Sequence, residues 1–168
     1  MKKRMKEWAD AILEAAIVLM VLYLVCWPVK IKGNSMLYTF AANDRVLMNR
    51  ICGELHWYQR GDFVVFTAPE KGINLPVMKR VIAMEGDIVK INDGNVFVNN
   101  ECLIEDYVTG ETEGELEIKV GEGQLFVLGD NRAHSTDSRN FGCIFEKDVE
   151  GTVYCRFFPL QKFQLFFQ

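Results

Sequence analysis

Serine is scarce in this chain, and its three copies fall where polar residues gather. The 168 residues include only Ser35, Ser135 and Ser138, although serine is among the commonest residues of ordinary proteins. Ser35 follows a long apolar segment in KGNSMLYTF, 32–40, and the other two serines lie in GDNRAHSTDSR, 129–139. This polar run comes directly after the apolar run QLFVL, and the end of a strand is a usual place for a functional site. A serine hydroxyl becomes a nucleophile when a base takes its proton.

The sequence offers two kinds of base for such a nucleophile. His134 lies in the polar run and His56 in ELHWYQ, so Asp137 could complete a Ser-His-Asp triad. Lys79 is the other candidate, because LPVMKRVIAM would place its amine in a largely apolar strand. Desolvation lowers a lysine pKa from about 10.4 toward the working pH, which makes the amine a competent base. On spacing alone, an ordinary surface lysine is the better prediction, so both alternatives stay open.

Metal and cofactor sites are weakly indicated. The five cysteines show no C-x-x-C spacing and, with two histidines, make a poor zinc set. Their odd number says little about disulfides. The segment GETEGELEIKVGEG is most simply explained as a solvated acidic hairpin or loop, and cation binding is the less favoured hypothesis. Its alternating glutamates are Glu111, Glu113, Glu115 and Glu117. No phosphate-binding glycine loop is present, and we expect neither a metal nor an organic cofactor.

The apolar segment 9–29, ADAILEAAIVLMVLYLVCWPV, is close to the roughly 20 residues that cross a bilayer as a helix. Asp10 and Glu14 interrupt it near its start, where acidic groups suit a helix N-terminus. A buried core helix and a cleavable export signal are the alternatives. No Ala-x-Ala-like cleavage site follows, however, and the bulky residues before Cys26 argue against a lipoprotein cysteine. We therefore expect an uncleaved anchor.

Charge and composition set the expected organisation. The basic start, MKKRMK, places the N-terminus in the cytoplasm. We expect a basic cytoplasmic segment over 1–8, a transmembrane anchor over 9–29 and an extracytoplasmic domain over 30–168. With 49% hydrophobic residues the chain is expected to fold, and a net charge of −4 disfavours nucleic-acid binding.

The part after the anchor is typical of β structure. Short β-branched or aromatic runs alternate with Gly, Asn, Asp and Pro; they are DFVVFTA, PVMKRVIAM, DIVKI, NVFVN, LEIKV and QLFVLGD. Asn92-Asp93-Gly94 supplies residues that tolerate positive φ, which predicts a hairpin in DIVKINDGNVFVNN. Beyond Ile12 to Trp27 there is no convincing long helical period. The expected fold is mostly β with one N-terminal helix.

Three motifs in a fixed order carry a family resemblance. SMLYTF, MKRVIAMEGD and GDNRAHSTDSRNFG, after one N-terminal anchor, resemble the signature boxes of bacterial type I signal peptidases, which are membrane-bound Ser/Lys proteases. The similarity runs from the anchor to the closing RFFPLQKF, and the last box is the most specific. The resemblance implies a signal-peptidase-like β catalytic domain. It also implies that Ser35 is the nucleophile, that Lys79 is the general base, and that Ser135 holds the lysine amine by a hydrogen bond.

The resemblance assigns supporting roles to further residues. An Asp137–Arg139 ion pair would stand beside the site, and three residues would shape the turn before it: Asp130, Asn131 and Arg132. Three other residues would lie next to the substrate: Met36, Arg80 and Ala83.

The chain departs from the family pattern at several positions. Tyr38 replaces a proline in the first box, and Ala83 and Glu85 stand where the second box commonly has Gly and Pro. Some members have an oxyanion-binding serine where this chain has Gly33, so we expect the oxyanion to rest on backbone N–H groups, in particular that of Ser35. We expect Ala83 to narrow a substrate-facing strand and to alter preference.

The implied function is removal of signal peptides from exported preproteins outside the plasma membrane, with small residues preferred at substrate positions −1 and −3. Expected partners are these signal peptides, the lipid bilayer and the protein export machinery, without nucleic acid. The rivals are a self-cleaving repressor protease, which would have a different leader, and a membrane-tethered module that binds export signals without cutting. Five phenylalanines crowd the C-terminus and either close the core or meet the membrane interface; they are Phe157, Phe158, Phe163, Phe166 and Phe167.

Overall fold

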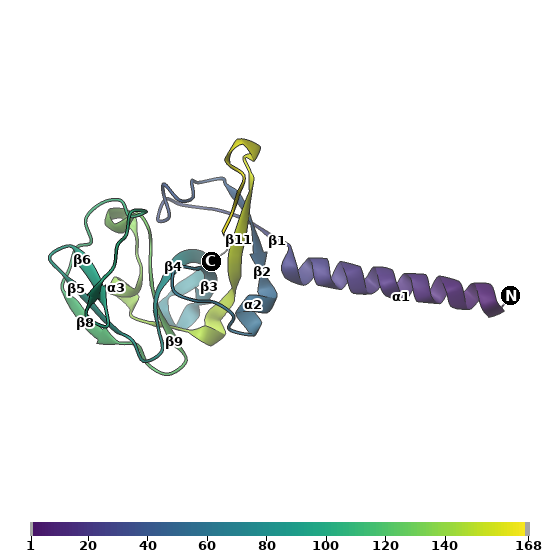
Figure 1. Ribbon diagram of the computed structural model, residues 1–168, viewed down its shortest axis with the longest axis horizontal. Helices are drawn as coiled ribbons and strands as arrows, with labels where there is room; N and C mark the ends of the chain where they lie inside the picture. Colours follow the sequence, from purple (N-terminus) through teal and green to yellow (C-terminus); the bar gives the residue numbers. More distant parts are fainter. Residues whose placement is uncertain (1, 167–168) are drawn as a thin grey trace.

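A long N-terminal helix projects from a β domain (Figure 1). The computed structural model describes residues 2–166, in which helix α1 spans Lys2–Val25. The part Arg4–Val25, with 22 residues, is long and apolar enough to cross a membrane. The helix ends before residue 29, because Pro28 disfavours helical backbone at Trp27, and a strand begins there. Asp10 and Glu14 lie inside the helix, whose first turn has no acidic residue, so the expectation that they sit at its N-terminus was wrong.

The larger sheet is antiparallel and holds the strands nearest α1. Its order is β1-β2-β11-β3-β4-β9-β10, and β12 pairs with β11 outside this path. In chain order the strands are β1 Trp27–Lys30, β2 Arg45–Asn49, β3 Phe63–Ala68, β4 Ile73–Met84, β9 Gln124–Leu128, β10 Ile144–Phe145, β11 Val149–Phe158 and β12 Gln164–Leu165.

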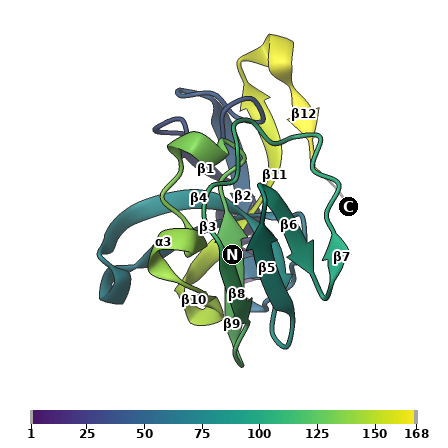
Figure 2. The same cartoon turned by 90° about the vertical axis from the view of Figure 1, so that its left-hand side faces the viewer.

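A smaller sheet lies on the side of the domain away from α1 (Figures 1 and 2). Its order is β7-β6-β5-β8, formed by Ile88–Asn92 (β5), Asn95–Val98 (β6), Glu101–Cys102 (β7) and Leu116–Lys119 (β8). Asn92 pairs with Asn95 across a two-residue turn in which Asp93 and Gly94 have φ of 49° and 77°. The predicted hairpin is therefore confirmed.

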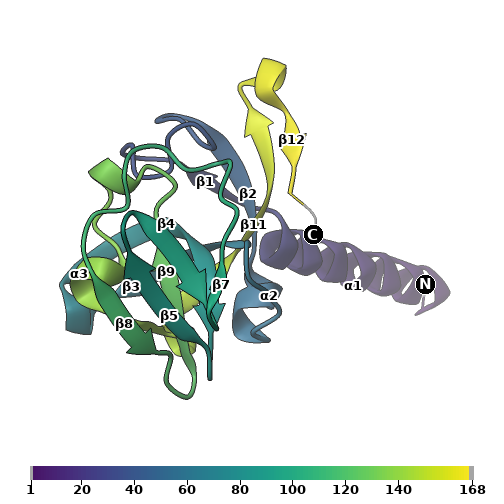
Figure 3. The same ribbon diagram turned by 60° about the vertical axis from the view of Figure 1, so that its left-hand side comes forward.

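The remaining helices are short. α2 spans Arg50–Glu54 and α3 spans Ser138–Phe141, where Asp137 and Asn140 form a capping box. Single 3-10 turns occupy Pro69–Lys71, Arg132–His134, Glu146–Asp148 and Leu160–Lys162. Figure 3 shows α3 beside β9, at the opposite end of the domain from α2 and α1.

Apolar side chains from both sheets form the core. One buried cluster joins the small sheet to β4 and β9 through Ile82, Ala83, Phe126 and Leu128. A second cluster lies beneath the segment that follows β1 and includes Ile31, Met36, Phe40, Phe63 and Met78. Because Ile31 and Met36 lie on either side of Ser35 in the sequence, their burial in this cluster fixes the backbone around Ser35.

Candidate active site

Ser35 lies on a tight turn that two buried side chains anchor on its C-terminal side. Met36 and Phe40 are 2% and 0% exposed, and the Phe40 N–H donates to the Met36 carbonyl over 2.7 Å. Asn131 holds the turn from the other side, since its backbone N–H donates to the Ser35 carbonyl and its Nδ2 to the Asn34 carbonyl, both over 3.0 Å. The turn therefore keeps Ser35 half-buried in a fixed place.

Lys79 lies within β4 and is only 4% exposed. Its Nζ donates a 3.0 Å hydrogen bond to the Ser135 hydroxyl. Burial lowers the pKa of Lys79 to about 8, while Asp137 opposes this shift and Arg139 supports it. A substantial fraction of the amine is thus neutral near physiological pH, as a general base requires.

Asp137 organises the part of the polar run 129–139 that surrounds Ser135. Its carboxylate accepts from the Gly129 N–H over 3.1 Å and from Arg139 Nε and Nη2 over 2.9 and 3.0 Å. Burial alone would raise the pKa of Asp137, but these bonds, the Arg139 charge and the Ser135 hydroxyl hold it below its usual range. Arg139 Nη2 also donates to the carbonyls of Arg132 and Ser135 over 2.7 and 3.3 Å. The expected Asp137–Arg139 ion pair is present and fixes the backbone of Ser135.

Gly129 is a site residue that the sequence did not single out. A Cβ at Gly129 would lie 2.6 Å from the Ser35 carbonyl oxygen and would also overlap the Ser135 hydroxyl. Gly129 therefore lies between the two serines at a position where no side chain fits. The only signal was its position at the start of the third box.

Arg80 supports the site from behind instead of facing a substrate. Its Nε and Nη2 donate to Asp130 over 2.8 and 2.6 Å, and its guanidinium lies between the rings of Phe63 and Tyr107. Thr39, which the sequence did not indicate, donates to the same Asp130 carboxylate over 2.5 Å. The placement of Arg80 beside the substrate was wrong, because this buried pair ties β4 to the turn after Ser35.

Ala83 was also placed wrongly. It is 0% exposed and packs in the core that joins the two sheets, so its methyl group cannot narrow a substrate-facing surface. Arg132 is buried and paired with Glu105 and Thr112, with Nη1 donating over 2.9 and 2.8 Å. It braces the loop from 105 to 112 against the turn before Ser135.

A groove of about 490 Å³ runs from Ser35 back to Trp27. The backbone from Trp27 to Gly33 forms one wall, Leu75 to Met78 of β4 form the other, and Met36, Met48 and Val65 complete the lining. In the described chain β9 pairs with β4 only from Arg80 to Met84, so the strand edge beside the groove is open. An extended peptide can add to such an edge through backbone hydrogen bonds.

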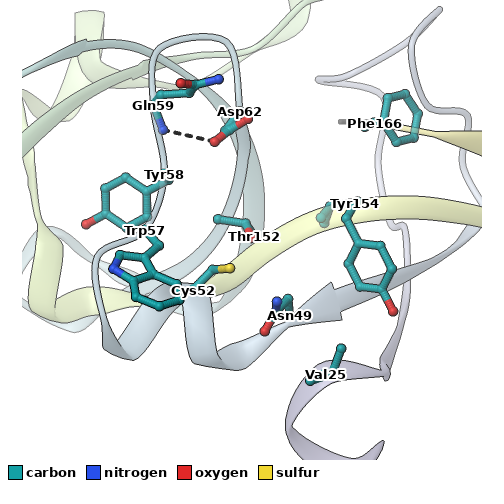
Figure 4. Close-up of a pocket in the computed structure, with 11 residues that line it drawn as sticks. Val25, Asn49, Cys52, Trp57, Tyr58, Gln59, Asp62, Thr152, Tyr154 and Phe166 are labelled. Atoms are coloured by element: carbon teal, nitrogen blue, oxygen red, sulfur yellow. Dashed lines mark hydrogen bonds between the residues drawn. The ribbon is translucent and has the colours of Figure 1, made fainter. Parts of the chain in front are cut away.

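Two other cavities are not lined by Ser35. One of about 510 Å³ lies between Val25 at the end of α1, α2 and β11 (Figure 4). Another of about 690 Å³ lies behind Arg80 and beside Tyr107. The groove is therefore the cavity that brings a ligand to the candidate nucleophile.

The histidine triad is not assembled. His134 is exposed, and His56 is exposed with its Nδ1 3.5 Å from Glu146. Among the described residues, the partners of the Asp137 carboxylate are Gly129, Ser135 and Arg139, none of them a histidine. Among these residues no group of metal-ligating side chains gathers to hold an ion.

The fold and the site together define a class of protein. A mostly β domain presents a fixed serine in a groove with an open strand edge, and a buried lysine whose amine binds the Ser135 hydroxyl. This arrangement suits a hydrolase that attacks an extended peptide with a serine hydroxyl and uses an amine as its base.

Comparisons with known proteins agree with this class. The family described as "Signal peptidase, peptidase S26" matches residues 5–158. "Probable signal peptidase I-1" of Synechocystis is 35% identical over 160 residues, covering 90% of this chain and 82% of the relative. Signal peptidase I of Bacillus licheniformis is 33% identical over 175 residues, covering 96% and 92%.

A solved structure gives the same result. The crystal structure of a signal peptidase I from Enterococcus faecalis V583 has 33% identity and a TM-score of 0.50, covering 56% of this chain and 95% of that one. The chain belongs to the signal peptidase family, peptidase S26, and is a serine endopeptidase with a mostly β fold and an N-terminal membrane anchor.

Proposed function

We propose that this enzyme is a signal peptidase I that cleaves signal peptides from exported preproteins with a Ser35–Lys79 dyad. The relatives named signal peptidase I match over most of the chain. The organisation predicted from the sequence completes the proposal: residues 1–8 are cytoplasmic, the helix crosses the plasma membrane, and the catalytic domain from residue 30 onward lies outside. The basic start of the chain supports this orientation.

The proposed reaction uses the groove and the lysine. Lys79 Nζ takes the Ser35 proton, Ser35 Oγ attacks the carbonyl carbon of residue −1, and the same lysine protonates the leaving amine of residue +1. Water then hydrolyses the acyl-enzyme. The backbone N–H of Ser35 stabilises the oxyanion, since Gly33 has no side chain to donate a second bond.

The observation that carries this proposal is the bond from Lys79 to Ser135. It holds the buried amine in the polar run 129–139, whose Asn131 N–H donates a 3.0 Å hydrogen bond to the Ser35 carbonyl, so one short segment positions both members of the dyad.

The proposed substrates are preproteins with small side chains at positions −1 and −3. The partners of the enzyme at the membrane would be the lipid bilayer and the export machinery, because the scissile bond emerges at the bilayer surface. The groove wall formed by Trp27 to Gly33 comes directly after α1, which supports delivery of the substrate from the membrane.

Cleavage of a defined preprotein tests the proposal. The full-length enzyme in lipid vesicles is expected to cut a preprotein with alanine at −1 and −3, and Ser35→Ala is expected to abolish the cut. Leucine at −1 is expected to reduce kcat/KM severely. Turnover by purified Ser35→Ala above a few per cent would reject the nucleophile, and comparable rates for alanine and leucine would reject the signal-peptidase specificity.

A further inference from the structure

One face of α1 carries an uninterrupted row of small and apolar residues. Ala9, Ile12, Ala16, Leu19 and Tyr23 recur at alternating spacings of three and four, which is the heptad period of a helix-packing face. We call these five residues the anchor seam. Ile12, Leu19 and Tyr23 are 67%, 66% and 53% exposed, so more than half of each side chain is open in the described chain. Small residues alternating with apolar ones let a second helix approach closely inside a bilayer.

The anchor seam leads directly into the groove. The rings of Tyr23 and Trp27 meet edge to face with centroids 4.9 Å apart, and Trp27 lines the groove together with Ser35. Arg50 fixes this junction, since its guanidinium lies over both rings and donates a 3.2 Å hydrogen bond to the Tyr23 hydroxyl. An apolar helix on the seam would therefore end where the groove begins.

The opposite face of α1 differs from the seam. At about 100° per residue, Val21, Val25, Asp10 and Glu14 point away from Tyr23. Val25 lines the separate cavity with Asn49 and Cys52, close to Tyr154 (Figure 4). The two carboxylates on that face would be costly against an apolar partner in the membrane, whereas the seam has no charge along its length.

We infer that the anchor seam is a docking surface for the apolar helix of the substrate's signal peptide. The inference rests on the proposed function and on continuity between the seam and the groove. A signal peptide consists of a basic start, an apolar stretch of about 7–15 residues and then the cleavage site. When that site reaches Ser35, the preceding extended segment runs along the groove toward Trp27, and the apolar stretch enters the bilayer beside Tyr23.

Length and direction agree with this arrangement. Both helices have cytoplasmic N-termini, so they lie parallel. An apolar stretch of 7–15 residues forms a helix of about 10–22 Å, and the seam from Ile12 to Tyr23 is about 16 Å long. The seam thus selects signal peptides by the length of their apolar stretch, and the groove selects them by the small residues before the cleavage site.

Photo-crosslinking tests which partner occupies the seam. Full-length Ser35→Ala enzyme in vesicles would carry benzoylphenylalanine at position 19, on the seam, or at position 21, on the opposite face. The position 19 probe is expected to crosslink to the apolar segment of an uncleaved preprotein, and the position 21 probe to lipid. Equal substrate crosslinking from both positions, or crosslinking from position 19 only to lipid or to a second enzyme copy, would overturn the inference.

Kinetics of a matched pair of variants give an independent test. Ala16→Leu adds bulk on the seam, and Ala11→Leu adds the same bulk on another side of the helix. Ala16→Leu is expected to lower kcat/KM for the preprotein at least about threefold, with no change for a short soluble peptide that has the same cleavage site. Ala11→Leu is expected to change neither rate.

The possible failures can be told apart. If the unsubstituted enzyme cuts neither the preprotein nor the peptide, the proposed function is wrong. If both are cut and Ala16→Leu leaves both rates unchanged, the function stands and the seam is not a docking surface.

Discussion

The Lys79 amine donates a 3.0 Å hydrogen bond to the Ser135 hydroxyl, and each carboxylate close to this amine is already paired with an arginine. Asp137 binds Arg139, and Asp130 binds Arg80. Both carboxylates would otherwise raise the pKa of Lys79, as their charges still partly do. Burial has the largest effect on the Lys79 pKa and Arg139 offsets part of the carboxylate charge, so the pKa falls to about 8.

Replacing Lys79 and His134 in turn should show which of these two candidate bases acts on Ser35. Lys79→Met is expected to lose activity as completely as Ser35→Ala, because neither histidine of the described residues is paired with Asp137 to act as the base instead. His134→Ala is expected to keep most of its activity, since His134 is exposed. Cleavage of a preprotein by each purified variant is the measurement. An inactive His134→Ala together with an active Lys79→Met would establish the histidine triad instead.

The pH dependence follows from the need for a neutral amine. With the pKa of Lys79 lowered to about 8 by burial, kcat/KM should rise with pH up to that value and level off above it. Activity should fall about tenfold for each pH unit below it, because only neutral lysine accepts the proton. A profile of kcat/KM that is flat between pH 5 and 7 would contradict the assignment.

The same burial should make Lys79 costly for stability. Below about pH 8 the lysine is protonated in both the folded and the unfolded chain, and the folded state bears the full cost of about 3 kcal/mol. The cost decreases as pH rises from about 8 to the unfolded pKa of about 10.4, and it is absent above that. Lys79→Met should therefore raise the free energy of unfolding at pH 7 but not at pH 11. Denaturant unfolding at both pH values checks this, and equal effects would show that packing accounts for the change.

A methyl group at Gly129 should separate the two serines. The added carbon would overlap the Ser135 hydroxyl and lie 2.6 Å from the Ser35 carbonyl oxygen, so the turn carrying Ser35 must move. A displacement of about 1 Å at a reacting group costs on the order of a hundredfold in rate. Gly129→Ala should thus lose activity of that order while circular dichroism still shows a folded domain. Full activity in a folded Gly129→Ala protein would show that the turn tolerates this shift.

Local patterns in the sequence predicted the parts of the fold that have strong local signals. Alternating runs bounded by turn residues identified β3, β4, β5, β6, β8 and β9, and Asn92-Asp93-Gly94 identified the hairpin. The strands β2 and β11 were not predicted, although β11 lies between β2 and β3 and links them into the large sheet. Both are set by distant pairing, which a local pattern does not reveal.

The site divides in the same way. Motifs gave Ser35, Lys79 and the Asp137–Arg139 pair, whose residue types already imply their chemistry. They did not give Thr39 or Gly129, and they placed Arg80 and Ala83 beside the substrate. The side of a strand on which a residue lies depends on register, and β4 has a register shift between Val81 and Ala83 in its pairing with β9. A shift of this kind changes which face each side chain takes, and Ala83 is buried.

The C-terminal phenylalanines divide between core and surface, which leads to a prediction about the membrane. Phe166 packs on Phe40 and Phe63 with ring centroids 4.9 and 5.2 Å away, so it closes the core. Phe158 and Phe163 are 47% and 58% exposed on the hairpin between β11 and β12, whereas Phe157 is half-buried and Phe167 lies outside the described residues.

Exposed aromatic rings favour the membrane interface, so this hairpin should touch the bilayer while α1 crosses it. In a full-length variant with Trp8, Trp27 and Trp57 changed to phenylalanine, Phe163→Trp should be quenched by vesicles of lipids brominated on the acyl chains. The matched control is Ile104→Trp. Ile104 is 94% exposed and follows β7 in the small sheet, away from α1, so its fluorescence should not change. Equal fluorescence of the Phe163→Trp variant with and without brominated lipid would show that the helix alone holds this enzyme at the membrane.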